Sequence, residues 1–171
     1  MRLDKFILDA NIFITPYRSY YPFDLARGFW EQMEKCLKRE DVILLDVVSS
    51  EIKRLEDDLS RWLGGIDNNE LTSVKTPEII QKYAEVLTYL QEAKVYKEAA
   101  FRSWASNDVA DGWIVAAAMT MDATIITTEA KSGPIDVHNP SKNAKIPDVA
   151  EYFGIRCENL FYFMRQMNFK L

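Results

Sequence analysis

Three acidic residues stand out because each lies close to the end of a short apolar run. Asp9 directly follows the run Phe6-Ile7-Leu8, and Glu51 begins the helix expected after a second apolar run. Glu129 follows a third run, which ends at Thr127. The carboxyl ends of parallel strands meet at one edge of a sheet, where the sites of open α/β proteins form. We therefore expect three strands to deliver a carboxylate to the same place.

A fourth acid, Asp111, belongs to a predicted helix over residues 108–121. It precedes Ile114, Val115 and Ala118 by helical spacings, so its side chain is expected on the apolar stripe that faces the sheet. Asp108 falls on nearly the same face, one turn nearer the helix start. Burying a carboxylate is costly unless it is paired or bound to a cation, and gathered carboxylates repel one another. A divalent cation removes both problems, and an all-oxygen set of ligands favours Mg²⁺ or Mn²⁺. The expected metal ligands are Asp9, Glu51, Asp108, Asp111 and Glu129.

Each acid also has a simpler interpretation. Asp9 is suited to capping a turn, and Glu129 to a solvated loop. Glu51 and Asp108 each suit a helix N-terminus, where the helix dipole favours negative charge. Asp111 is the hardest to explain in this way because its expected neighbours are apolar. The joint placement of the acids, rather than any one of them, carries the metal-site hypothesis.

The apolar patterns around these acids predict a single α/β domain over residues 1–171. Strands are expected at 6–8, 42–48 and 123–127, with a further one at 155–157, and helices at 22–39, 51–62, 77–101, 108–121, 148–153 and 158–167. This alternation favours a parallel central sheet with helices on both faces. The segment 129–145 shows no periodicity, and loops of such length often have a function.

Composition excludes several classes of protein. Lys and Arg number 21 against 26 Asp and Glu, and the net charge of −5 excludes binding of nucleic acid by overall positive charge. Two cysteines and one histidine exclude a disulfide scaffold and a Cys/His zinc site, and they disfavour acid–base catalysis by histidine. No apolar run approaches the ~18 residues of a membrane span, and the first residues carry no signal-peptide core. We expect a cytoplasmic protein without a membrane span.

The order and spacing of four motifs resemble those of the PIN-domain nuclease family. The matching stretches are Leu8-Asp9-Ala10-Asn11, 48–52, 111–118 and 126–129. The resemblance implies a three-layer α/β/α fold and an Mg²⁺- or Mn²⁺-dependent endoribonuclease that hydrolyses single-stranded RNA. It further implies a toxin of the VapC type, with a cognate antitoxin as partner.

Carried over residue by residue, the resemblance assigns the family's acidic quartet to this chain and adds two supporting positions. Asn11 matches a small polar residue beside the first acid, and Thr127 matches a threonine that helps to hold the site. The chain departs from the family in having Glu where most members have Asp at the fourth acid, and in a longer tail that starts near Lys145. The matched quartet is Asp9, Glu51, Asp111 and Glu129.

Binding of RNA at an acidic edge needs nearby positive charge. The cations that flank the acids in sequence are either this substrate-binding rim or solvated surface charges, and they are Lys53, Arg54, Lys131, Lys142 and Lys145. Two other functions stay open: a non-catalytic PIN-like binding protein, and a phosphatase of the haloacid-dehalogenase type. Asn11 disfavours the phosphatase, since that chemistry needs a second Asp there. A homodimer formed through the apolar face of the helix from Pro77 is also left open.

Overall fold

The computed structural model describes residues 4–67 and 70–171, and a five-stranded sheet lies at the centre of this part of the chain. All strand pairs are parallel, in the order β3-β2-β1-β4-β5. The central strand is β1 (Phe6–Leu8), with β2 (Val42–Leu45) and β4 (Thr124–Ile126) beside it. The edges are β3 (Leu71–Thr72) and β5 (Cys157–Glu158). The predicted α/β class with a parallel sheet is confirmed.

The three inner strands form because their residues are apolar and have helices to cover both faces. Every residue of β1 and β2 is buried, and so are two of the three in β4. Such continuous burial is typical of parallel strands between two helical layers. In the register of the sheet, Leu8 lies opposite Ile126, so the residues that follow them emerge side by side at the carboxyl edge.

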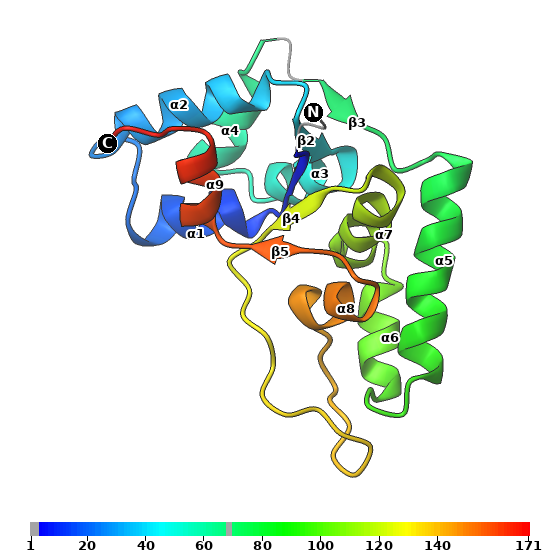
Figure 1. Ribbon diagram of the computed structural model, residues 1–171. Coiled ribbons are helices and arrows are strands. Elements are labelled where there is room, and N and C mark those ends of the chain that lie inside the picture. Colours follow the sequence, from blue (N-terminus) through cyan, green and yellow to red (C-terminus); the bar gives the residue numbers. More distant parts are fainter. Residues whose placement is uncertain (1–3, 68–69) are drawn as a thin grey trace.

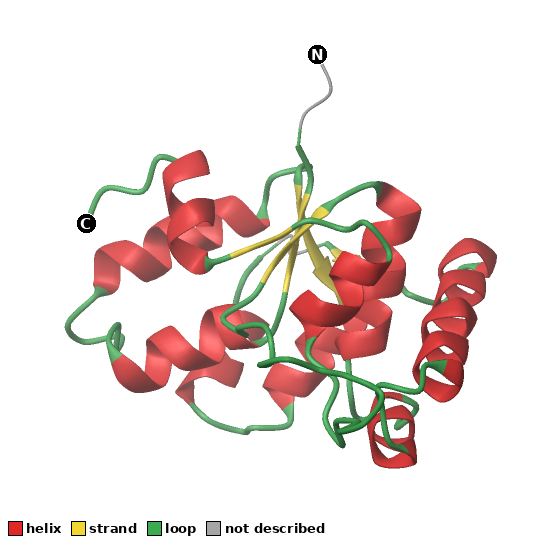
Figure 2. Cartoon of the chain, turned by 60° about the horizontal axis from the view of Figure 1, so that its bottom comes forward, coloured by secondary structure: helices red, strands yellow, loops and turns green. Residues whose placement is uncertain are grey.

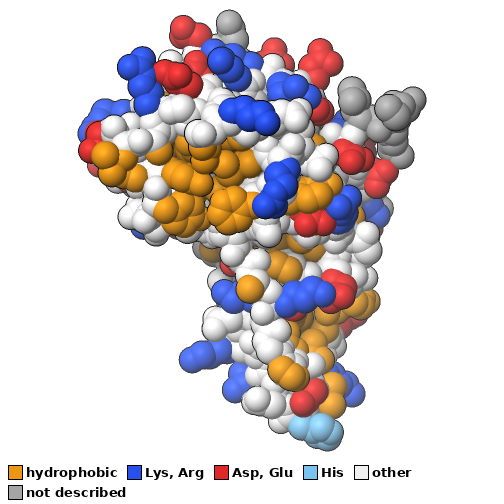
Figure 3. All heavy atoms as spheres, turned by 60° about the vertical axis from the view of Figure 1, so that its left-hand side comes forward, with side chains coloured by type: hydrophobic (Ala, Val, Ile, Leu, Met, Phe, Trp, Pro, Cys, Tyr) orange, Lys and Arg blue, Asp and Glu red, His pale blue; other side chains and the backbone are white. Residues whose placement is uncertain are grey.

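One helical layer consists of α1 (Asn11–Ser19), α2 (Arg27–Leu37), α4 (Asp58–Gly64) and α9 (Leu160–Gln166) (Figure 1). Aromatic rings hold this layer together: Trp30 of α2 meets Trp62 of α4 with ring centroids 4.9 Å apart. The C-terminal segment packs on this layer through Phe169, whose ring centroid lies 5.8 Å from that of Phe29 in α2. Figure 3 views the molecule from this side and shows hydrophobic side chains gathered between Lys and Arg residues.

The other layer contains α7 (Asp111–Met121), α8 (Ile146–Tyr152), α6 (Glu98–Trp104) and α5 (Pro77–Glu92). The core residues 114–118 of α7 are fully buried, because this helix lies between the sheet and α5. Tyr83 of α5 stacks on Trp113 of α7 with ring centroids 3.7 Å apart. Figure 2 shows the sheet between the two helical layers, which completes the three-layer arrangement.

The carboxyl edge of β2 differs from the sequence prediction. The strand ends at Leu45 rather than at residue 48, and α3 (Asp46–Lys53) begins at once. The reason is Asp46, whose Oδ1 accepts hydrogen bonds from the backbone N–H groups of Val47 (2.8 Å) and Val74 (3.2 Å). This carboxylate stabilises the turn into the helix and ties it to the segment after β3.

Two helices that the sequence predicted as continuous are divided. The helix expected at 51–62 breaks at Glu56, which has a positive φ of 52°, and α4 restarts with Asp57 as its N-cap. The helix expected at 77–101 ends at Glu92, and α6 begins at Glu98. Two elements were not predicted: α1, which contains Pro16, and the two-residue strand β3.

Four predicted elements have boundaries shifted by one to three residues: α7 begins at 111 instead of 108, and α8, β5 and α9 occupy 146–152, 157–158 and 160–166. The helix expected at 22–39 is shorter and occupies 27–37 as α2. None of the helices in the described residues has the length and apolar character to cross a membrane.

Candidate active site

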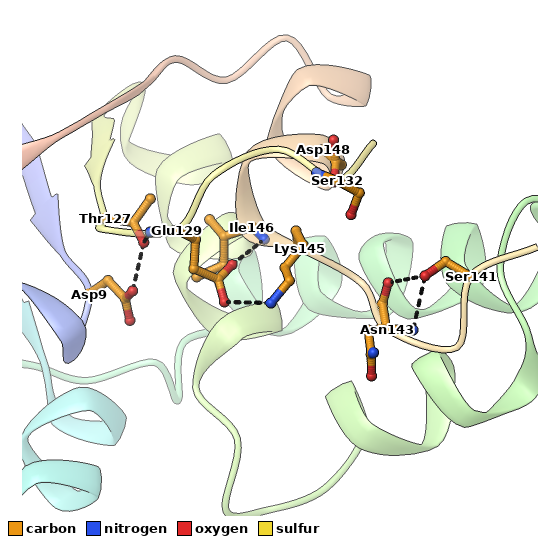
Figure 4. Close-up of polar contacts among 9 residues, drawn as sticks. All are labelled: Asp9, Thr127, Glu129, Ser132, Ser141, Asn143, Lys145, Ile146 and Asp148. Atoms are coloured by element: carbon orange, nitrogen blue, oxygen red, sulfur yellow. Dashed lines mark hydrogen bonds and ion pairs between the residues drawn. The ribbon is translucent and has the colours of Figure 1, made fainter. Parts of the chain in front are cut away.

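Asp9 is the most deeply buried acid of the site, and only 3% of its surface is exposed. It directly follows β1, and its Oδ2 accepts a 2.7 Å hydrogen bond from the hydroxyl of Thr127, which directly follows β4 (Figure 4). The same hydroxyl oxygen accepts a hydrogen bond from the backbone N–H of Glu129 at 3.1 Å. Thr127 therefore connects the first predicted acid to the segment that carries the fourth.

Glu129 is held by two consecutive residues at the start of α8. Its Oε2 accepts a 2.8 Å hydrogen bond from the backbone N–H of Ile146, and its Oε1 lies 3.9 Å from Nζ of Lys145 (Figure 4). Only 19% of the Glu129 side chain is exposed. Both carboxylate oxygens thus face groups that carry positive charge or partial positive charge.

Asp111 and Glu51 face the same region from two helices. Asp111 is the first residue of α7, and its pKa is raised to about 7, mainly by burial and then by the charges of Asp9, Glu129 and Glu51. The pKa of Glu51 is raised by burial and by Asp9. Lys145 acts on Asp111 in the opposite sense and lowers its pKa. The structure therefore brings these four acids within electrostatic reach of one another.

The pKa of Asp9 is raised to about 6, first by burial and also by the charge of Glu129. The hydrogen bond from Thr127 is the largest influence that lowers it, and Asn11 contributes in the same direction. The two residues predicted to support the acids therefore both favour the charged form of Asp9. Burial nevertheless prevails, so this carboxylate takes up a proton at higher pH than an exposed one.

Two predictions about the acids are wrong in detail. Glu51 does not begin its helix, because Asp46 starts α3 five residues earlier. Asp108 lies before α7 instead of in its first turn, and its side chain is 80% exposed and paired with Arg54 at 3.7 Å. The guanidinium of Arg54 also donates to the Asp108 backbone oxygen at 2.8 Å. Asp108 is thus engaged with Arg54 and is not among the charges that shift the pKa values of Asp9, Glu51 and Asp111.

The sequence of residues 6–171 matches the family model described as "Domain of unknown function (DUF4411)". The chain belongs to this family. None of the curated proteins compared with the chain matches it. For this DUF4411 member, the function is therefore argued from the site itself.

The predicted cationic rim is only partly available to a ligand. Lys131 is bound to Glu151 at 2.8 Å, Arg54 to Asp108, and Lys145 to Glu129. Lys53 and Lys142 are exposed, and no ion pair of either is seen in residues 4–67 and 70–171. The orientation of Lys145 into the acids could not be found from sequence, since it depends on the path of a loop without periodicity.

The donor chemistry of the DUF4411 site suits a hard divalent cation. Four carboxylates supply only oxygen atoms, and three of them have raised pKa values. The spacing is a separate matter: across the described ranges, no three His, Cys, Asp or Glu side chains are arranged to hold a metal ion as they stand. The residues fit Mg²⁺ or Mn²⁺ by charge and atom type, and their side chains must move together to share one ion.

A pocket of about 520 Å³ opens beside Glu129, at the carboxyl ends of β4 and β5. Thr127 and Glu129 line it together with Lys131, Arg156, Cys157 and Glu158. Its volume is in the range of ligand pockets in proteins. Sequence patterns do not indicate this pocket, because its walls come from separate segments, at 127–131, in α8 and at 154–159, that meet only in the fold.

Proposed function

We propose that this protein is a metal-dependent endoribonuclease that hydrolyses phosphodiester bonds of single-stranded RNA. The observation that carries the proposal is the electrostatic coupling of Asp9, Glu51, Asp111 and Glu129 at the carboxyl edge of a parallel sheet. The same four positions match the acidic quartet of the PIN-domain family in the sequence. A non-catalytic scaffold has no need for four converging carboxylates, whose repulsion costs stability.

In this proposal, the four carboxylates hold Mg²⁺ or Mn²⁺. When bound, such an ion neutralises the charge of a phosphate and lowers the pKa of a bound water. Thr127 orients Asp9, and the Ile146 N–H fixes one oxygen of Glu129. The pocket beside Glu129 offers room for a nucleotide next to that one acid. No side chain of the site needs to act as a covalent nucleophile.

We further propose that the nuclease acts in the cytoplasm as a toxin controlled by a cognate antitoxin. Expression of the wild-type chain should slow bacterial growth, and co-expression of a small protein encoded beside it should restore growth. An Asp9→Asn chain should be harmless in the same strain. If Asp9→Asn is as toxic as wild type, growth inhibition does not depend on the acidic site.

The central test is cleavage of labelled single-stranded RNAs of varied sequence with Mg²⁺, with Mn²⁺ and with EDTA. Wild type should cut at least one RNA, and EDTA should stop it. Asp9→Asn and Asp111→Asn should each reduce the rate by roughly 100-fold or more, since metal ions contribute several kcal/mol to transition-state stabilisation. Asp24→Asn is the control: this aspartate is exposed, lies between α1 and α2, and should leave cleavage unchanged.

The absence of both cleavage and divalent-dependent RNA binding over the whole panel would contradict the nuclease proposal. The non-catalytic binding protein would then be the better interpretation. Cleavage that persists in EDTA, or in Asp9→Asn, would instead indicate a contaminating nuclease or a different site.

A further inference from the structure

Lys145 places an ammonium group beside Glu129, and we propose that it serves as the counter-cation of the metal-free site. A divalent cation then has to displace Lys145 from Glu129 in order to bind. This inference rests on the proposed function, since it concerns the same carboxylates. It assigns to Lys145 a role in metal loading instead of the surface role that its sequence position suggested.

The first support is geometric. Lys145 is the N-cap residue of α8, and its Nζ lies 3.9 Å from Oε1 of Glu129. The next residue, Ile146, donates its backbone N–H to the other oxygen at 2.8 Å. Each oxygen of the Glu129 carboxylate thus already has a partner, one the Lys145 ammonium and the other the Ile146 N–H (Figure 4). A metal ion needs at least one of them.

The second support is the way the preceding loop is fixed. Ser132 donates its backbone N–H to Asp148 of α8 at 2.9 Å. Ser141 is held at both backbone groups, which bond Lys97 and Val95 at 2.8 Å each. The loop therefore delivers Lys145 to Glu129 from a defined backbone path, and the contact is not a chance position of a long side chain on an unsupported segment.

The third support is charge. The ammonium of Lys145 lies 3.9 Å from a carboxylate whose side chain is only 19% exposed, so this contact is screened by solvent less than a surface pair. Arg54 acts on Glu51 but is itself bound to Asp108. Lys145 is thus a cation that offsets negative charge at Glu129.

The test compares Lys145→Met with Lys35→Met, a control whose lysine is exposed on α2 in the other helical layer. Mn²⁺ binding is measured by titration calorimetry at fixed pH and ionic strength. Lys145→Met should bind Mn²⁺ roughly 10-fold more tightly than wild type, because a positive charge next to a divalent ion opposes its binding. Lys35→Met should stay within about twofold of wild type, since its charge lies in the other helical layer, away from the acids. Lys145→Arg keeps the charge and should resemble wild type.

Thermal unfolding supplies an independent readout. In EDTA, Lys145→Met should melt at lower temperature than wild type, because the repulsion of the acids is no longer offset. Saturating Mn²⁺ should abolish most of this difference. Should Lys145→Met fail to fold in EDTA, Lys145→Gln is used for both measurements, since its amide can still hydrogen bond to Glu129.

Equal Mn²⁺ affinity in Lys145→Met and wild type would overturn the inference while leaving the proposed function intact. Weaker binding in the variant would also overturn it, and would make Lys145 a residue that positions Glu129 for the metal. If wild type and all variants bind no Mn²⁺, the proposed function fails as well.

Discussion

The hydroxyl of Thr127 donates a 2.7 Å hydrogen bond to Asp9, which lies 118 residues away in the chain. The two residues meet because β1 and β4 are adjacent and parallel, with Leu8 opposite Ile126. The Asp9 backbone N–H continues the ladder and donates to the Ile126 oxygen at 3.0 Å. Strand register therefore sets the position of the central acid, and a buried side-chain contact then fixes its orientation.

Replacing Thr127 by Val should cost about 1.5–3 kcal/mol of unfolding free energy, the range for a lost hydrogen bond to a charged group. Both Thr127 and Asp9 are only 3% exposed, so water cannot replace the hydroxyl easily. Thr127→Ser retains the hydroxyl and should recover most of the loss. Urea unfolding at pH 8 in EDTA measures both variants. Equal stability of Val and Ser at this position would show that the hydrogen bond contributes little.

Asp9→Asn should leave the metal-free protein as stable as wild type or make it more stable. The carboxylate is buried and repelled by Glu129, and its removal relieves both costs. Asp41→Asn provides a contrast of opposite sign, because Arg39 lowers the pKa of Asp41 and the pair is lost in that variant. Thermal melts in EDTA compare the three proteins. A large drop for Asp9→Asn would make Asp9 a structural partner rather than a metal ligand.

Stability without metal should fall as pH rises from 5 to 8. The folded-state pKa values of Asp9 (about 6) and Asp111 (about 7) lie above the ordinary Asp value of 3.8, so the folded protein binds more protons than the unfolded chain in this window. The cost begins above the unfolded pKa and is complete above about pH 7. Each shift corresponds to a few kcal/mol at 1.36 kcal/mol per unit.

Urea unfolding at several pH values in EDTA checks this dependence, with Asp111→Asn as the second protein. The variant should show a flatter profile and higher stability at pH 8, because Glu51, Glu129 and Asp9 then face a neutral amide while Lys145 still offsets them. A profile that rises between pH 5 and 8 in wild type would contradict the repulsion between the acids.

The sequence was sufficient for the inner sheet and for much of the site. The strands at 6–8 and 124–126 are short, wholly or largely apolar runs, and the rule that sites form at carboxyl edges located Asp9 and Glu129. The starts of helices were harder to predict from the sequence. Ser49 and Ser50 resemble N-caps, yet the turn is made by Asp46, whose partner Val74 belongs to a distant segment. No local pattern indicates such a contact.

Asp108 and Lys145 show the same limit within the site. Helical spacing placed Asp108 beside Asp111. The helix begins only at Asp111, so helical spacing does not apply to Asp108, which lies three residues earlier. The inward position of Lys145 depends on hydrogen bonds between its loop and α8, and neither partner is marked by sequence periodicity. Residues on regular elements could be placed, and residues that depend on loop anchoring could not.

Gly112→Ala should destabilise the protein, although alanine usually stabilises a helix. A Cβ at this position would lie 2.8 Å from Cε2 of Tyr83. The Tyr83 ring cannot move freely, since it stacks on Trp113 and its hydroxyl donates to the Trp104 oxygen at 3.0 Å. We expect a loss of about 1–3 kcal/mol, typical of overpacking.

Gly64→Ala is a suitable control for this effect, because nothing lies within 4 Å of a Cβ at that helical position. Thermal melts of the two variants should differ clearly. Gly112→Ala should also weaken metal binding, since Asp111 precedes the displaced residue. Unchanged stability in Gly112→Ala would mean that α5 and α7 separate at little cost.

RNA binding should depend on Lys53 and Lys142 more than on the other predicted cations. Lys131 and Arg54 are paired with Glu151 and Asp108, and Lys145 is directed into the acids. In the Asp9→Asn background, which prevents cleavage, Lys53→Gln/Lys142→Gln should weaken binding of a labelled single-stranded RNA. Loss of two phosphate contacts should reduce the slope of log affinity against log salt by about 1.4, at ~0.7 per contact.

The matched control is Lys35→Gln/Lys170→Gln, which removes the same charge from exposed positions on α2 and in the C-terminal segment. Both double variants change the net charge equally, so a general electrostatic effect would weaken RNA binding in both. A loss confined to Lys53→Gln/Lys142→Gln would place the RNA at these two lysines. Equal salt slopes in the two variants would contradict a local rim, and binding would then depend on the metal and on the pocket beside Glu129.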